Sequence, residues 1–210
     1  MATRTFTHLY DSYDDARQTV EALEASGVPH SDISIVSNNV DSRHAGAGTT
    51  AADCTATPSN ATGTGVTTGT LVGGGVGLLT GLGLLAIPGV GPVVAAGWLV
   101  ATLTGAGLGA ASGGLLGSLV HAGVSEEDAH TYAEGVRRGG TLVTVRADES
   151  QASRIETVLT GRTASAVNMT TRRADYQADG WSRYDDNAAP YTTDQLTAER
   201  SRRVRVVKAD

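Results

Sequence analysis

Glycine recurs at every fourth position in two stretches of this chain. Each glycine in a solvated helix costs about 0.8–1 kcal/mol relative to alanine, so a run of them needs a compensating contact. A stripe without side chains lets a second backbone approach closely, which gains dispersion contacts along its whole length. The two glycine ladders, as we call them, therefore predict closely packed helices that associate with each other or with another copy of the chain. They consist of Gly65, Gly69, Gly73, Gly77 and Gly81 in the first ladder, and Gly105, Gly109, Gly113 and Gly117 in the second.

A compact reversal separates the two ladders. It contains two prolines and two glycines in five residues, which is typical of a tight turn. No Asp, Glu, Lys or Arg occurs between Cys54 and Ser125, and the other residues of both ladders are mostly apolar. The pattern predicts a glycine-zipper α-helical hairpin over residues 64–122. The turn residues are Pro88, Gly89, Gly91 and Pro92.

The sequence leaves the surroundings of this hairpin open. Each arm is long enough to cross the roughly 30 Å hydrocarbon core of a bilayer. Against insertion stand several threonines and the lack of Lys or Arg close to either end, because cationic flanks normally anchor a membrane helix. The alternatives are a soluble oligomer whose hairpins share a core, and burial of the hairpin within one monomer.

The segments on either side of the hairpin predict short strands and helices. Ser12 and Ser125 each precede carboxylates by one to three residues, which indicates helix starts with side-chain caps. The expected strands cover residues 5–9, 33–36, 141–146 and 164–169, with helices after the first and third and one more leading out of the hairpin. This order predicts an α+β fold of the ferredoxin-like βαβ/βαβ type, with two helices on one face of a four-stranded sheet.

Five regions follow from these expectations. In the last region, the C-terminal tail, we expect Trp181, Tyr184 and Tyr191 to anchor the tail to its own domain or to a neighbour. The arginines from Arg200 to Arg205 are expected to form a solvated helix end, with binding to anionic lipid or to a partner's acidic face as the alternative. The regions are the first half of the α+β domain (1–39), a flexible linker (40–63), the helical hairpin (64–122), the second half of the α+β domain (123–170) and an extended C-terminal tail with a short helix (171–210).

Composition and spacing predict neither catalysis nor a cofactor. The net charge of −6 argues against nucleic acid as a partner. The five histidines lack ligand spacing, so no metal site is expected, and the carboxylate clusters stand in first helical turns, where capping explains them. Two GxGxxA matches are explained by the ladders, so no nucleotide site is expected. The single cysteine and the lack of an apolar signal core predict a cytoplasmic protein.

Four segments together resemble the YflT-type general stress proteins, also called the general stress protein 17M-like family. They are Leu9–Ala16, Ala86–Val93 at the hairpin turn, Val124–Ala129, and Tyr132–Val145. The resemblance spans about residues 5–160. It implies a bacterial protein that is induced by stress and that has no established enzymatic activity or cofactor, so no catalytic residue is transferred.

Three functional hypotheses result. The first is a non-enzymatic general stress protein that assembles with itself through the glycine-zipper hairpin, at the inner membrane and with both ends in the cytoplasm. The second is a soluble, self-assembling scaffold or cage-like homo-oligomer. The third is a small-molecule sensing module, which rests on fold analogy alone. The expected partners are other copies of the chain and, under the first hypothesis, membrane lipid.

Overall fold

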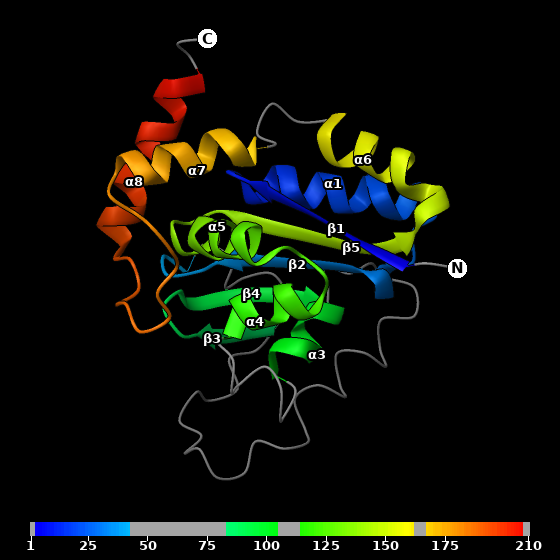
Figure 1. Ribbon diagram of the computed structural model, residues 1–210, viewed down its shortest axis with the longest axis horizontal. Coiled ribbons are helices and arrows are strands. Elements are labelled where there is room, and N and C mark those ends of the chain that lie inside the picture. The colour runs from blue at the N-terminus through cyan, green and yellow to red at the C-terminus, as the bar shows by residue number, and fades with distance from the viewer. Residues whose placement is uncertain (1–2, 43–82, 105–113, 162–166, 208–210) are drawn as a thin grey trace.

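A computed structural model describes residues 3–42, 83–104, 114–161 and 167–207. Five strands form one antiparallel sheet in the order β1-β5-β2-β4-β3 (Figure 1). The strands are β1 (Thr3–Tyr10), β2 (Ile33–Asn38), β3 (Gly83–Ile87), β4 (Gly91–Gly97) and β5 (Thr141–Asp148). The α-helices are α1 (Tyr13–Ala25), α3 (Trp98–Thr104), α4 (Gly114–His121), α5 (Glu126–Arg137), α6 (Ala152–Gly161), α7 (Met169–Ala178) and α8 (Thr193–Val207), with 3₁₀ turns η1 (His30–Asp32) and η3 (Glu149–Gln151). The α+β class is confirmed.

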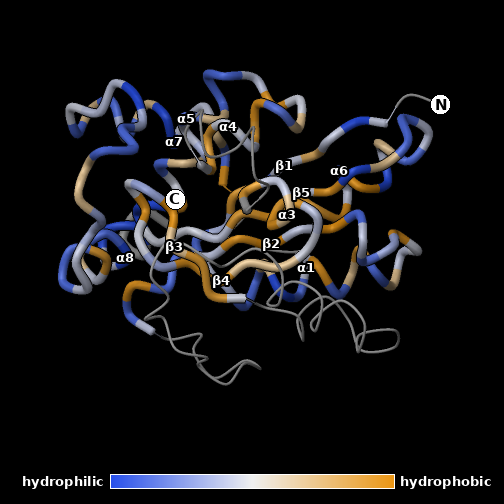
Figure 2. Tube along the Cα trace, turned by 90° about the horizontal axis from the view of Figure 1, so that it is seen from below, coloured by the Kyte–Doolittle hydropathy of each residue, from blue (hydrophilic) through white to orange (hydrophobic). Residues whose placement is uncertain are grey.

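Helices cover both faces of the sheet. On one face, α1 and α6 pack on alternate residues of the strands, among them Phe6, Ile35 and Val143. On the other face, α3, α4 and α5 pack on the intervening residues, among them Leu9 and Val36. All six residues of β2 are buried, as expected for a central strand with helices on both sides. Figure 2 shows the apolar residues gathered along the strands and along the helix sides that face them.

The prediction of a purely helical hairpin over 64–122 is wrong for its described centre. Residues 83–97 form a β-hairpin in which β3 pairs with β4 from Gly83↔Ala95 to Ile87↔Gly91. The other side of β4 pairs with β2, from Ser34↔Gly97 to Asn38↔Val93. Because β5 occupies one side of β2, a partner on the second side satisfies the remaining backbone groups, and a strand at 91–97 supplies it.

The predicted reversal at residues 88–92 is confirmed, although it joins strands instead of helices. The amide of Val90 donates to the carbonyl of Ile87 at 3.1 Å. Pro88 stands at the second position of this turn and Gly89 at the third with φ +74°, the combination that a type II turn requires. Gly91 also has positive φ, at +95°.

The fourth predicted strand, 164–169, is wrong in its described part. Asn168 caps α7, and its side chain accepts a hydrogen bond from the amide of Thr171. Val167 donates one backbone hydrogen bond, of 3.1 Å, to Leu9 of β1, and α7 begins two residues later. The ferredoxin-like expectation is not confirmed, because the described sheet gains β3 and β4 beside β2 and has no further strand beside β1. The predicted caps at Ser12 and Ser125 are confirmed by side-chain bonds to Asp15 and Asp128.

Most ladder glycines lie outside the described residues. Gly117 is the exception, and it lies half-buried in α4. The first ladder and the first three glycines of the second ladder therefore stay predictions. Within the described part of the chain, no helix has the length and hydropathy needed to cross a membrane.

Candidate functional site

The C-terminal tail contacts the turn between β3 and β4. Tyr184 is 4% exposed, and its hydroxyl donates to the carbonyl of Pro88 at 2.5 Å. A Cβ on Gly89 would lie 2.7 Å from the carbonyl oxygen of Asp185, and a Cβ on Gly91 would lie 2.9 Å from Pro190. The turn therefore needs glycine at both positions for the close approach of the tail as well as for its own backbone conformation. The tail packs on its own domain.

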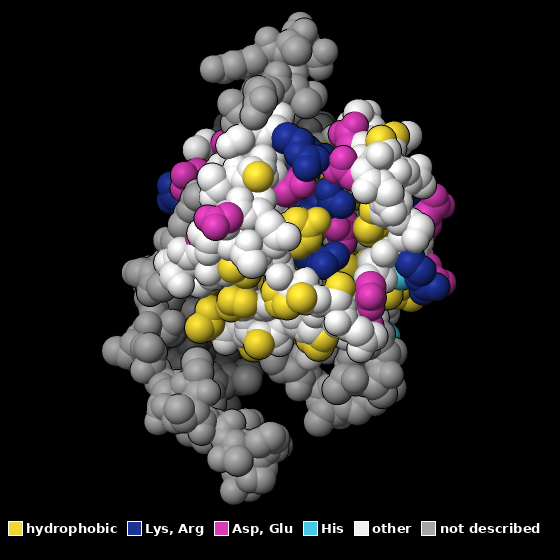
Figure 3. Space-filling model, turned by 90° about the vertical axis from the view of Figure 1, so that its left-hand side faces the viewer, with side chains coloured by type: hydrophobic (Ala, Val, Ile, Leu, Met, Phe, Trp, Pro, Cys, Tyr) yellow, Lys and Arg dark blue, Asp and Glu magenta, His cyan; other side chains and the backbone are white. Residues whose placement is uncertain are grey.

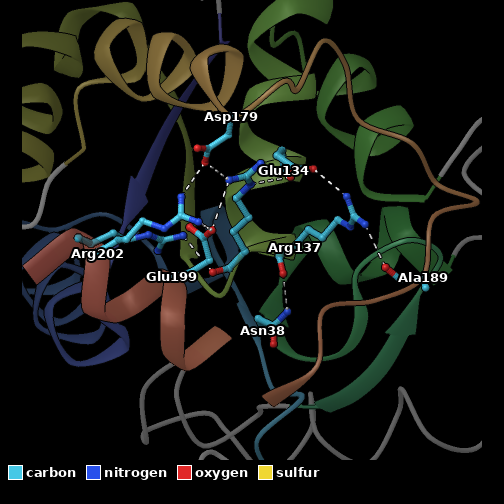
Figure 4. A network of polar contacts seen from close by, with 9 residues as sticks. Asn38, Glu134, Arg137, Asp179, Ala189, Glu199 and Arg202 are labelled. Atoms are coloured by element: carbon cyan, nitrogen blue, oxygen red, sulfur yellow. Dashed lines mark hydrogen bonds and ion pairs between the residues drawn. The ribbon is translucent and has the colours of Figure 1, made fainter. Parts of the chain in front are cut away.

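A buried ion-pair network joins α5 to the tail (Figure 4). The carboxylate of Glu134 is 1% exposed and accepts from Nε of Arg138 at 2.7 Å and from Arg137 at 3.3 Å. Arg137 also donates to the carbonyl of Ala189 at 3.0 Å. Desolvation works against the charge of Arg138, but Glu134 outweighs it and raises the pKa of the guanidinium above its ordinary value. Arg138 therefore stays charged in the interior.

The same guanidinium reaches two carboxylates of the tail. Arg138 lies 3.1 Å from Asp179, which follows α7, and 3.6 Å from Glu199 of α8. Arg202 contacts the same two acids. Desolvation would raise the pKa of Asp179, but hydrogen bonds from Arg138 and Arg202 outweigh it and lower that pKa. The network thus connects α5, the end of α7 and α8 through one buried arginine, Arg138.

Aromatic rings complete the contact between the tail and α5. The guanidinium carbon of Arg138 lies 4.4 Å from the ring centre of Tyr176 and 5.9 Å from that of Tyr191. Arg137 lies 5.0 Å from Tyr191, within the range of a cation–π contact. Tyr191, expected to anchor the tail, does so by packing on two arginines.

Further arginines of α7 and α8 pair with carboxylates of the domain. Arg172 and Arg203 approach Asp11 at 2.7 and 2.9 Å, and Arg200 approaches Asp41 at 2.6 Å. Arg173 binds both Glu127 and Asp128. Figure 3 shows basic and acidic side chains intermixed on this side of the molecule, above a band of hydrophobic ones.

Two expectations about charge are thereby corrected. The expected solvated helix end is wrong for Arg200 and Arg203, because both pair with acids of the same chain. The carboxylates explained as helix caps have a second role that the sequence pattern did not reveal, since Asp11, Glu127 and Asp128 also receive tail arginines. Opposite charges at separations of 45 to 192 residues carry no periodic signal, so only the tertiary fold identifies the pairs.

The arrangement defines an α+β domain with helices on both faces of its sheet. Its own C-terminal helices, α7 and α8, bind to it through ion pairs. Residues 5–82 match the model of the family described as heat induced stress protein YflT domain. This confirms the family resemblance, although three of the four segments that suggested it lie beyond the match. No curated protein and no solved structure matches the chain. The YflT domain marks a bacterial general stress protein.

Proposed function

We propose that this stress protein is non-enzymatic and that it assembles with other copies of itself through the glycine ladders. The observation that carries the proposal is the four-residue glycine spacing within a stretch that has no charged residue from Cys54 to Ser125. Such a surface suits close contact between backbones and offers no charged side chain for chemistry.

Described residues that follow the last glycine of each ladder support this proposal. Among the described residues, the exposed large hydrophobic side chains are Leu84, at 53%, and Val120, at 43%. Leu84 follows Gly81 by three residues, and Val120 follows Gly117 by three residues. Each ladder therefore ends near an apolar side chain that is exposed in the described part of the chain. A second copy is the partner that would bury both.

The non-enzymatic part of the proposal rests on how the acids are used. Asp11, Glu127 and Asp128 bind arginines at 2.5 to 2.9 Å, and Glu134 is enclosed with Arg138. A carboxylate engaged in this way is a poor general base, because its oxygens already accept from a guanidinium and are not placed to take a proton from a substrate.

Substitution within the ladders tests self-assembly. Replacing both Gly73 and Gly109 with leucine puts a side chain on each smooth stripe and should shift the mass measured by light scattering from oligomer to monomer. Gly161→Leu is the matched control, because Gly161 ends α6 outside the ladders and a Cβ there meets nothing closer than 3.8 Å. An unchanged oligomer mass in the double variant would show that the ladders are not the interface.

The medium of assembly, inner membrane or soluble scaffold, is tested separately by fractionation of cells that express the full chain. Recovery only with detergent would support membrane association. A defined high-mass species in the detergent-free soluble fraction would support the scaffold and refute insertion.

A further inference from the structure

The outer edge of β1 has backbone groups without partners. The carbonyls of Thr7 and Leu9 accept from outside the sheet, from the Tyr132 hydroxyl at 2.9 Å and the Val167 amide at 3.1 Å. Peptide groups alternate in direction along an antiparallel strand, so Thr3 and Thr5 also direct their N–H and C=O groups outward. Within the described residues, neither has a hydrogen-bond partner on that side.

This edge lies in a groove. A cavity of about 510 Å³ is bounded by β1 from Thr3 to His8, by Leu159 and Thr160 of α6, and by the α4–α5 turn at 122–125 together with Tyr132. Its place is the one that a fourth strand beside β1 would occupy, and none of the described residues forms a strand there. The six residues of β1 from Thr3 to His8 present an edge about 20 Å long, at 3.3–3.4 Å per residue. The groove is thus a vacant strand position between two helical walls.

One hydrogen bond, donated by Tyr132 of the α5 wall, reaches this edge of β1 without blocking it. Desolvation raises the pKa of Tyr132 to about 12, so its hydroxyl remains a donor to Thr7 at any physiological pH. The side-chain hydroxyl of Thr7 is buried and has no hydrogen-bond partner in the described part of the chain. The bond from Tyr132 goes to the carbonyl of Thr7, so within the described residues the outward amide of Thr7 has no partner and can donate to an incoming carbonyl.

The charge around the groove is negative. Asp128 of α5 and Glu156 of α6 line opposite walls. Asp128 shares Arg173 with Glu127, and Glu156 is exposed and has no ion-pair partner among the described residues. The arginine in the lining, Arg4, is bound to Glu149 at 3.3 Å. A positively charged occupant would therefore be attracted from both walls.

We propose that this groove binds an extended, positively charged peptide segment of a partner protein, which adds a strand to β1. Main-chain hydrogen bonds to Thr3, Thr5 and Thr7 would give affinity, and the acids on the walls would select cationic side chains. A second copy of β1 does not fit this position, because it lies between the same two walls and two recessed edges cannot meet.

The probe is a fluorescein-labelled hexapeptide of alternating lysine and valine, titrated into the full-length protein by fluorescence anisotropy. Two N-methylated forms carry the methyl groups on odd or on even residues. A strand added at an edge directs only every second N–H toward its neighbour, so one form should bind at least tenfold more weakly and the other within threefold of the parent. Equal binding of both forms would overturn the proposal, as would equal binding of a peptide with glutamate in place of lysine.

Two protein variants test the same edge. Thr5→Pro removes an outward N–H and no bond to β5, and should weaken binding at least tenfold, whereas Thr5→Val keeps the backbone and should stay within threefold. Circular dichroism establishes that both variants are folded, and the methylated peptides give the answer on the wild-type protein if Thr5→Pro is not. Unchanged binding by folded Thr5→Pro would refute the inference. A dimer of the wild type that Thr5→Pro abolishes would assign the edge to a second copy and also refute it.

Discussion

Replacing Gly97 with alanine distinguishes the β-hairpin from the helical hairpin that the ladder pattern predicts. Gly97 ends β4 with φ +92°, and a Cβ there would lie 2.1 Å from the carbonyl oxygen of Ile33 and 2.7 Å from Cα of Ser34. Both atoms are backbone of β2, so relief requires the paired strands to separate by about 1 Å. Positive φ costs an alanine about 1–2 kcal/mol, and overpacking costs about 1–3 kcal/mol more.

The expected loss for Gly97→Ala is therefore about 3–4 kcal/mol, or a fall of roughly 10 °C in melting temperature for a chain of this size. If residue 97 were inside a helix, alanine would instead stabilise it by about 0.8–1 kcal/mol. The control is Gly27→Ala, because Gly27 has nearly the same φ, +93°, with nothing within 4 Å of an added Cβ. Urea unfolding followed by circular dichroism measures both variants.

Two results would contradict this reasoning. Equal destabilisation by Gly97→Ala and Gly27→Ala would show that backbone strain alone is at work and that β4 does not approach β2 so closely. A stabilised Gly97→Ala variant would favour a helix at this position over the β-hairpin.

Two further predictions concern ionisable groups. Glu134→Gln should lower the free energy of unfolding by about 3 kcal/mol, because it leaves the guanidinium of Arg138 without its buried partner. The control Glu149→Gln should lower it by less than about 1 kcal/mol, because the ion pair of Glu149 with Arg4 is exposed. Similar losses for the two variants in urea unfolding would contradict the burial of the network. Desolvation lowers the pKa of His8 below 6.5, so the unfolded chain takes up the proton first and the contribution of His8 to stability is lost as the pH falls below about 6.5. Urea midpoints between pH 7.5 and pH 5 should therefore decline more in the wild type than in His8→Gln, and parallel declines would exclude this role.

Local chemistry explains which parts of the fold could be predicted. The hydroxyls of Ser12 and Ser125 cap α1 and α5 as expected, because a cap needs only a side chain and the next few amides. Thr192 and Gln195 exchange bonds of 2.8 and 3.3 Å in a capping box at the start of α8, which is equally local. The turn at Pro88 and Gly89 is likewise local, since its residues determine their own φ values.

The candidate sites depended on partners that are distant in the chain. The tail network could not be paired from sequence, because Arg138 meets Asp179 and Glu199 only after α7 and α8 have packed. No sequence pattern indicated the groove beside β1. An edge is free only where no other strand pairs with it, and strand pairing is decided by the tertiary structure.

What the sequence determined by itself was therefore the α+β class, the helix starts, the turn and the stress-protein family, all of which are encoded in short runs of residues. The tertiary structure decided the rest. Residues 91–97 became strand β4 because β2 has a second edge to satisfy, and a hydrogen-bonded edge buried between helices outweighs the helical tendency of Ala95 and Ala96, while Val93 and Val94 favour a strand. Among the described residues, the outer edge of β1 received no such partner strand.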